Sequence, residues 1–338
     1  MRIALLPALS VLSLALFACG GGSSPSGAGG ATSGTGGTPS TTSGSGSSTG
    51  AGAGGSSTGA GAGGSMPGHC PIFPADNAWN TDISAAPVDD LSDVYVATIG
   101  GDAPLHPDFG DTFGIPFVNV DGSLAKSPVT FDDSPEESDP GPYPIPQDPP
   151  IEQDGDAHLL MIHTGECKLY ELYATHHESD GWHAGSGAIW DLSSNQGRPA
   201  GWTSADAAGL PIFPGLARWE EANAGAIKHA LRFTVPETQR AYVAPASHFA
   251  SDITDASYPP MGLRMRLKKS FDQSGYPPIT QPILTALKTY GMILADNGSP
   301  WFISGAPSAQ WVNEELDALK QLKGSDFEAI KTGPLVTK

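Results

Sequence analysis

The feature that most restricts where this chain can form a folded core is a low-complexity segment over residues 20–68. It consists almost entirely of Gly, Ser, Thr and Ala, and the sequence STGAGAGGS occurs in it twice in tandem. Such a segment has too few apolar side chains to bury and is typical of a flexible tether, with a reach of about 35–40 Å. We therefore expect a tether over residues 19–68 and one globular domain over residues 69–333.

The amino terminus has the pattern of an export signal. Residues 1–18 combine Arg2 with the apolar run IALLPALSVLSLALFA, which is shorter than a membrane-spanning helix and fits a secretory signal. The sequence LFAC, ending at Cys19, resembles the lipobox of bacterial lipoproteins. This resemblance implies cleavage before Cys19, a lipid on its thiol and, because Gly20 follows, an outer-membrane or cell-surface location. An ordinary signal peptide with a chance cysteine is the alternative.

The two remaining cysteines, Cys70 and Cys167, lie in the region expected to fold. Two thiols in an exported domain usually pair. A bridge between them closes a loop of about 100 residues and contributes roughly 4–5 kcal/mol in the chain-entropy treatment. No electropositive group near Cys167 would activate a thiolate, so we expect a structural disulfide.

The charge balance limits the partners of this protein. It has 17 Lys and Arg residues against 36 Asp and Glu residues, a net charge of −19. This excess argues against a nucleic-acid partner and against an anionic lipid surface, so we expect membrane contact only through the lipid anchor. Outside the tether, where such motifs would have a fold around them, the sequence also lacks G-x-G-x-x-G, a phosphate-binding loop, G-x-S-x-G and H-E-x-x-H. We therefore expect no nucleotide and no cofactor.

The folded region is predicted to be a β-rich α+β domain, built on antiparallel sheet as a sandwich or barrel, with three or four peripheral helices. Alternation and turn residues predict strands over residues 115–120, 129–131, 158–163, 168–174, 187–192, 229–235, 240–245, 263–268, 292–295 and 301–304. Helical spacing predicts helices over residues 91–99, 214–224, 279–290 and 312–323, and one turn near residues 204–206. In the strand over residues 263–268, Arg264 and Arg266 are expected to face outward.

Residues 182–235 contain most of the chemistry that the sequence offers. Glycines permit tight turns, indoles supply flat apolar faces, and carboxylates and imidazoles can transfer protons. A glycoside hydrolase usually needs two carboxyl groups. The candidates for this pair are Asp191, Asp206, Glu220, Glu221 and Asp296. We favour Asp191 and Glu221, because each lies beside an indole whose apolar face would raise the pKa of the carboxyl.

Histidine and tryptophan residues complete this predicted site. His229 is a candidate general base or a residue that orients Glu221, and a histidine of the core is the alternative. The tryptophans expected to stack on sugar rings are Trp190, Trp202, Trp219 and Trp301. The carboxylates also have structural interpretations: Asp191 as the cap of a turn, Glu220 and Glu221 as exposed helix residues, and Asp296 as part of a turn.

Two polar stretches could hold a metal ion. The acidic, Pro-rich passage over residues 132–156 could bind calcium through its clustered carboxylates, but we favour a solvated loop. The turn HHESDGWH contains His176, His177 and His183, whose spacing matches no tight-ligand pattern. We interpret it as an exposed hairpin tip and expect no metal there.

The sequences GSGAIWDL, RPAGWTSADAAGLPI, HALRFTV, PPMGLRMRLK, YGMILADNGSPWFISG and LKGSDFEAI resemble a group of secreted bacterial proteins. The resemblance extends from about Phe73 to Ile330. Some members of that group are fused to discoidin-type modules, which commonly bind carbohydrate, so the resemblance implies export and a polysaccharide partner. It carries over no catalytic residue. Two functions remain open: a glycoside hydrolase with a carboxylate pair, and a non-catalytic glycan-binding or adhesion lipoprotein.

Overall fold

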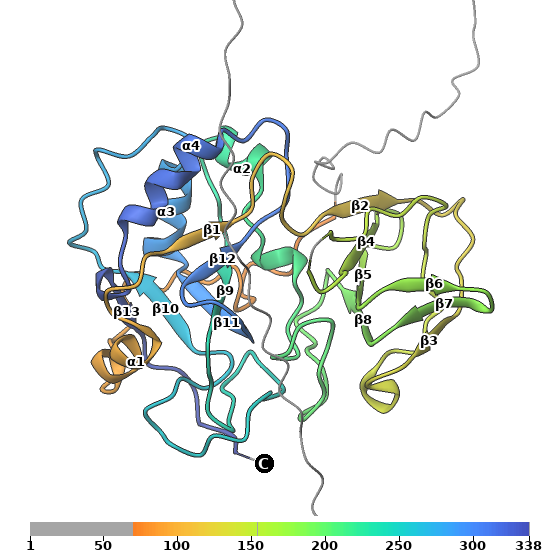
Figure 1. Cartoon of the computed structure of the whole chain (residues 1–338), viewed down its shortest axis with the longest axis horizontal. Helices are drawn as coiled ribbons and strands as arrows, with labels where there is room; N and C mark the ends of the chain where they lie inside the picture. Colours follow the sequence, from red (N-terminus) through yellow and green to blue (C-terminus); the bar gives the residue numbers. More distant parts are fainter. Residues whose placement is uncertain (1–69, 154, 338) are drawn as a thin grey trace, which may run out of the picture. The chain divides into compact units, whose positions relative to one another are not determined.

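The structure is a computed structural model that describes residues 70–153 and 155–337 (Figure 1). The predicted signal segment, the lipidated Cys19 and the tether over residues 19–68 lie outside the described residues. The described part is one β-rich α+β domain with three sheets and four α-helices, which confirms the predicted fold class. Parallel and antiparallel pairings occur in each of the three sheets.

The largest sheet has six strands and contains the centre of the core. Its order is β1 (His106–Asp108), β12 (Phe302–Ser304), β9 (Leu231–Val235), β11 (Met292–Asn297), β10 (Arg264–Leu267) and β13 (Phe327–Ala329). Strand β9 pairs in parallel with β11 and antiparallel with β12. Leu231, Phe233 and Val235 of β9 are completely buried, as expected for a strand with neighbours on both sides.

Two smaller sheets form the rest of the β-structure. The four-stranded sheet has the order β2 (Phe117–Val120), β4 (Leu159–His163), β5 (Lys168–Tyr173) and β8 (Ser186–Asp191). The three-stranded sheet has the order β3 (Val129–Phe131), β7 (Gly181–Ala184) and β6 (His176–Glu178). Strands β4 and β5 form the predicted antiparallel hairpin.

The four-stranded sheet is apolar on both faces, because a separate part of the core packs on each. Leu160 and Ile162 of β4 belong to the large apolar cluster shared with the six-stranded sheet. Leu159 and Met161 alternate with them and belong to a smaller cluster that includes Ala184 of β7. Every residue of β4 is buried as a result.

Helices are few and short. The four α-helices are α1 (Ser92–Ile99), α2 (Trp219–Asn223), α3 (Gln281–Thr289) and α4 (Asn313–Leu316). The shorter 3-10 turns are η1 (Pro135–Glu137), η2 (Phe213–Gly215), η3 (Asp317–Gln321) and η4 (Gly324–Asp326). In the described part of the chain, no helix is long and apolar enough to span a bilayer.

Two predicted helices differ from the structure. The helix expected after Pro214 is divided into η2 and α2, because Leu216 is extended and Ala217 forms a parallel bridge with Gly305. The helix expected over residues 312–323 is α-helical for one turn and then tightens into η3. Val312, placed by its spacing on the apolar stripe, is 48% exposed.

The outward orientation predicted for Arg264 and Arg266 on β10 is wrong. Both side chains are buried, because an irregular segment before α1 lies over this face of the sheet and supplies backbone acceptors. Arg264 donates to the carbonyls of Ala78, Thr81 and Tyr290, and Arg266 donates to the carbonyl of Ile83 and to Glu328. The predicted strand over residues 240–245 is also wrong, since only isolated bridges form there, at Tyr242.

The predicted disulfide between Cys70 and Cys167 is confirmed. It joins the first described residue to the turn between β4 and β5, across a sequence separation of 97 residues. The bridge fixes the start of the folded region to the four-stranded sheet.

Candidate functional site

Arg232, in the middle of β9, is the charge around which a polar cluster is built. Its side chain is buried, and its Nε and Nη2 atoms donate to the two carboxylate oxygens of Asp206 at 2.9 Å each. Nη2 also donates to Oδ2 of Asp296 at 3.2 Å, and Nη1 donates to Oγ of Ser304 at 2.7 Å. One guanidinium is thus shared between two carboxyl groups, which come from a loop and from β11.

The surroundings of Asp296 favour its protonated form. Since Oδ1 of Asp206 and Oδ2 of Asp296 both bind the same nitrogen, these oxygens lie within about 6 Å of each other. Burial and the negative charge of Asp206 raise the pKa of Asp296 to about 7, although Arg232 acts in the opposite direction. Asp296 is therefore able to hold and release a proton near neutral pH.

A second buried pair, His158 and Glu152, fixes the loop that carries Asp206. His158 directly precedes β4, and its Nδ1 lies 2.6 Å from Oε2 of Glu152. Its Nε2 lies 3.1 Å from the carbonyl oxygen of Ala205, the residue before Asp206. Burial opposes a charged ring, but the hydrogen bond and charge of Glu152 prevail and raise the pKa of His158. Both partners of the ring are oxygen acceptors, so the charged form of His158 can donate to each of them.

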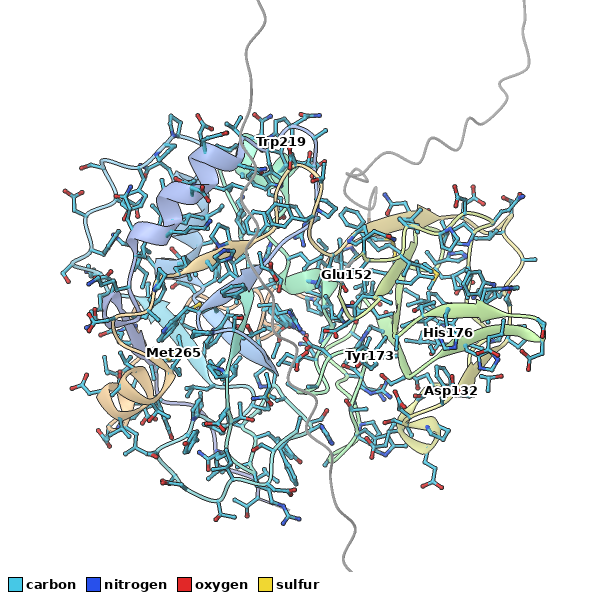
Figure 2. The ribbon with its side chains drawn as sticks, in the orientation of Figure 1. Asp132, Glu152, Tyr173, His176, Trp219 and Met265 are labelled. Carbon is cyan, nitrogen blue, oxygen red and sulfur yellow. A yellow bond between two sulfur atoms is a disulfide. The ribbon has the colours of Figure 1, made fainter. Side chains whose placement is uncertain are left out.

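A polar cavity of about 300 Å³ lies against this cluster. Four aspartates line it: Asp133, Asp156, Asp206 and Asp296. Tyr173, at the end of β5 (Figure 2), also lines it, with its ring centre 5.8 Å from that of His158. Several hydroxyl and imidazole groups complete the wall, among them Ser186, Thr203, Ser204 and His248. The described residues that line the cavity include no Lys or Arg, so its chemistry suits a neutral, hydroxyl-rich or cationic ligand.

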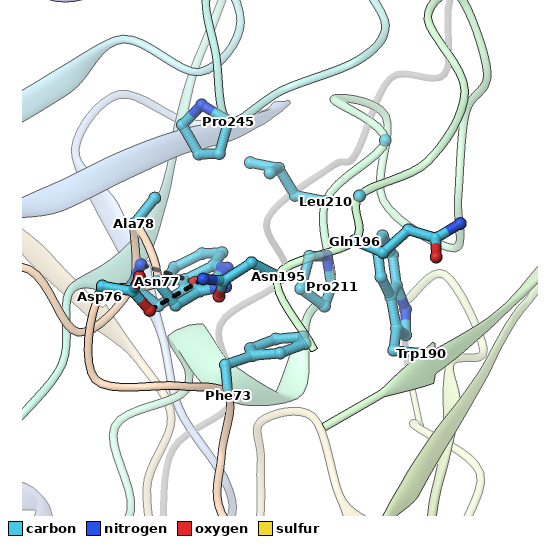
Figure 3. Close-up of a pocket in the computed structure, with 13 residues that line it drawn as sticks. Phe73, Asp76, Asn77, Ala78, Trp190, Asn195, Gln196, Leu210, Pro211 and Pro245 are labelled. Atoms are coloured by element: carbon cyan, nitrogen blue, oxygen red, sulfur yellow. Dashed lines mark hydrogen bonds between the residues drawn. The ribbon is translucent and has the colours of Figure 1, made fainter. Parts of the chain in front are cut away.

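A second cavity, of about 320 Å³, has a different lining (Figure 3). Its apolar walls come from Phe73, Trp79, Trp190, Leu210, Pro211 and Pro245, and its polar groups from Asp76, Asn77, Asn195 and Gln196. Asn195 accepts from Nδ2 of Asn77 at 2.9 Å and donates to Asp76 at 2.8 Å. Flat apolar faces beside amides suit recognition of an uncharged ligand that carries hydroxyl groups.

The loop between β8 and η2 lines both cavities. Its first part supplies Asn195 and Gln196 to the second cavity, and its later part supplies Asp206 to the polar cavity. Glu171 of β5, completely buried, anchors the end of this loop by accepting from the backbone N–H groups of Ile212 and Phe213. Burial raises the pKa of Glu171 to about 7.

Asp191 and Glu221, the favoured catalytic pair, have separate environments. Asp191 is exposed and caps a turn by accepting from the backbone N–H and the hydroxyl of Ser193, which lower its pKa. Glu221 on α2 is ion-paired with Arg218 at 2.9 Å, and its Oε2 lies 3.1 Å from Nε2 of His229. Burial acts to raise the pKa of Glu221, but these two partners lower it to about 2. The described linings of the two cavities include neither residue.

His229 contacts the carboxylate that it was proposed to orient, and it is also buried in the core. Its Nδ1 donates to the carbonyl of Ala230 at 2.8 Å, and its Nε2 lies 2.8 Å from Nη2 of Arg218. Arg218 is completely buried, with its guanidinium 4.7 Å from the ring centre of Phe213. Glu220 is half-buried beside Trp219 at the start of α2.

The four predicted stacking tryptophans differ in their exposure. Trp301 is completely buried and donates from Nε1 to the carbonyl of Gly100 at 2.8 Å, so it cannot meet a sugar ring. Trp190 is almost buried, and its indole N–H binds Glu171, yet it lines the second cavity. Trp202 and Trp219 are half-buried, and the guanidinium of Arg198 lies over the ring of Trp202.

Sequence reasoning named Asp206 and Asp296 among the candidates but missed Arg232, His158 and Glu152. Alternation placed Arg232 opposite the apolar face of its strand, and this position was not linked to either aspartate. A signal was present, because an arginine inside a buried strand needs a carboxylate partner. The sequence does not indicate which of its 36 acidic residues supplies that partner.

The chain matches no protein-family model, and no curated protein or solved structure matches it. The resemblance to exported bacterial proteins therefore stays a prediction. What the site can do must be inferred from its geometry.

Proposed function

We propose that this protein is an exported, lipid-anchored, cell-surface protein that acts on polysaccharide as a glycoside hydrolase, with Asp296 as its general acid. One observation carries the proposal: Asp296 lines a polar cavity and has a pKa of about 7. Glycosidic cleavage requires a carboxylic acid that still holds its proton at the working pH and can deliver it to the leaving oxygen.

The other carboxylates of the polar cavity have different roles in this proposal. Asp206 is completely enclosed and tied at both oxygens to Arg232, so it acts as a positioning residue that maintains the proton on Asp296. Asp133 and Asp156 also line the cavity and are exposed. They are the candidates for the general base that activates water, or for the nucleophile.

The expected substrate is an uncharged polysaccharide. Four aspartates in the cavity and a net charge of −19 disfavour polyanionic glycans. Hydroxyl and carboxylate groups in the wall match the hydrogen-bonding groups of neutral sugars. Lipid anchorage through Cys19 and a tether of about 35–40 Å reach would present the domain to glycans outside the cell.

The test is reducing-sugar release from a panel of purified cell-wall and plant polysaccharides. We expect Asp296→Asn to reduce release by at least about 100-fold, the usual minimum for loss of a general acid. Asp191→Asn is the matched control, because it makes the same chemical change at an exposed turn and should leave release within about twofold of the wild type. Equal loss in both variants, or none in Asp296→Asn, would contradict the assignment.

The second candidate function is a non-catalytic glycan-binding or adhesion lipoprotein, and the second cavity favours it. There Trp190 and Phe73 provide apolar walls beside Asn195 and Gln196 (Figure 3). This function predicts no sugar release from any polysaccharide, but slower migration of the protein in gels that contain one of them. Asn195→Ala and Gln196→Ala should then restore the migration, whereas Asp296→Asn should have no effect.

A further inference from the structure

The three-stranded sheet brings together two polar stretches that are far apart in the sequence. His176 on β6 and His183 on β7 are directly opposite partners in the antiparallel pair, and their rings lie 5.4 Å apart. Asp132 directly follows β3, which pairs in parallel with β7, and its backbone N–H donates to the carbonyl of Ala184. The acidic loop and the histidine hairpin thus meet on one face of this sheet, where Figure 2 shows Asp132 and His176 near each other.

The distances between these side chains match those of atoms that share a metal ion. Nδ1 of His183 lies 3.3 Å from both carboxylate oxygens of Asp132, and Nε2 of His176 lies 3.9 Å from one of them. Atoms that bind a tetrahedral metal at about 2.1 Å are about 3.4 Å apart. The three ligand atoms lie within 4.8 Å of one another, so a small displacement brings all of them into a coordination sphere.

His176 is already held in the tautomer that a metal requires. Its Nδ1 lies 2.9 Å from the carbonyl oxygen of Ala174, so this nitrogen carries the proton and donates it. The lone pair is then on Nε2, the atom that faces Asp132 and lies 3.3 Å from Oε1 of Glu178. Metal-binding histidines typically donate the other ring N–H to a backbone carbonyl or carboxylate in this way.

Two more carboxylates lie beside these ligands. Glu178 lies 3.3 Å from Nε2 of His176, the atom that also faces Asp132, so it is placed to complete the coordination. Asp180, in the β6–β7 turn, lies 3.1 Å from Nε2 of His183, the ring nitrogen that does not face Asp132, and so orients that ring. The side chains of Asp132 and His176 are 45% and 48% exposed. An ion can therefore reach them from solvent.

We propose that Asp132, His176 and His183 bind a divalent transition-metal ion of the zinc class, with Glu178 or water completing its coordination. Two imidazoles with a carboxylate favour zinc and its neighbours over calcium, which prefers oxygen ligands alone. The site is separate from the proposed catalytic cluster.

The experiment is calorimetric titration of the metal-free full-length protein with zinc chloride. We expect one strongly bound zinc ion per chain. His183→Ala and His176→Ala should each weaken binding by at least about 100-fold, since loss of an outer-shell partner alone costs about 10–100-fold. The matched control is His177→Ala: this neighbouring ring packs edge-on against Trp182, with ring centres 4.7 Å apart, and its removal should leave the affinity unchanged.

Cobalt substitution gives a second readout that does not depend on any enzymatic activity. The wild type and His177→Ala should show the visible absorption bands of a bound cobalt ion, and Asp132→Asn and His176→Ala should lose them while keeping the wild-type circular dichroism spectrum. Zinc binding that is equally strong in His183→Ala, or is absent from the wild type, would overturn the proposal. If the zinc proposal fails, the proposed role of Asp296 still stands, because sugar release is measured separately.

Discussion

Two buried arginines, Arg232 and Arg218, organise two clusters with opposite effects on their carboxylates. The guanidinium groups are buried to a similar degree, with 4% and 0% of each residue exposed. Arg232 is shared between Asp206 and Asp296, whereas Arg218 and His229 share the single carboxylate of Glu221. The pKa of Asp296 rises to about 7, and that of Glu221 falls to about 2.

A salt bridge to arginine therefore does not by itself decide whether a carboxyl is ionised. What decides it is the ratio of positive to negative groups inside each cluster. Where two carboxylates share one cation, one of them keeps its proton more readily. Glu221 has the guanidinium of Arg218 to itself and lies beside His229, which holds it ionised. The cluster with the surplus of carboxylates is the one that lines a cavity.

The largest expected effect is on stability, and it tests whether Arg232 is essential to its cluster. Arg232→Met leaves Asp206 buried without its counter-ion, so we expect a loss of about 3–5 kcal/mol in the free energy of unfolding. Urea denaturation followed by circular dichroism measures this loss. A loss under about 1 kcal/mol would show that the two aspartates share a proton without the arginine. Arg232 would then not be the group that organises this cluster.

The two clusters should also respond in opposite directions to pH. Glu221 has a folded-state pKa below its unfolded value of 4.5, so its contribution of up to about 3 kcal/mol is present above pH 4.5 and is lost as the pH falls toward 2. Asp296 has a folded-state pKa above its unfolded value of 3.8, so its effect on stability becomes less favourable as the pH rises from about 4 to 7.

Unfolding curves recorded across this pH range separate the two effects. Glu221→Gln should flatten the decline at acidic pH and leave the slope above pH 4 intact, while Asp296→Asn should do the reverse. If the free energy of unfolding depended on pH in the same way in both variants, Glu221 and Asp296 would not have the opposite pKa shifts described above.

The smallest expected effect is a shift of the pH–activity profile, and it tests whether Asp206 is a positioning residue. Asp206→Asn removes the negative charge that raises the pKa of Asp296, so the basic limb of the pH–activity profile should move to lower pH, by about one unit. Glu221→Gln should not move this limb. A uniform drop in activity with an unchanged profile would indicate a purely structural role for Asp206.

Much of the fold is predictable from the sequence, because its signals are local. An apolar run and a four-residue turn predict the β4–β5 hairpin, and two cysteines after a predicted export signal predict the disulfide. The buried arginines of β10 and the division between η2 and α2 depend on segments that pack from elsewhere. Local alternation cannot reveal these contacts.

The candidate site was only partly predictable for the same reason. Asp296 was identified from its place near a strand end, where functional residues often occur. The pKa of Asp296, however, depends on Asp206 and Arg232, and its partner Arg232 lies 64 residues away in the sequence. Proximity to tryptophan favoured Asp191 and Glu221, but an indole next in sequence need not cover its neighbour in space.

The Cys70–Cys167 bridge also has a mechanical consequence. Under the proposed lipid anchorage, tension applied through the chain before Cys70 passes across the sulfur–sulfur bond to the turn between β4 and β5. This tension bypasses the backbone between the two cysteines, which carries Asp133 and Asp156 of the polar cavity. Pulling on the anchor would then load the four-stranded sheet first, and not the loops that hold these two aspartates.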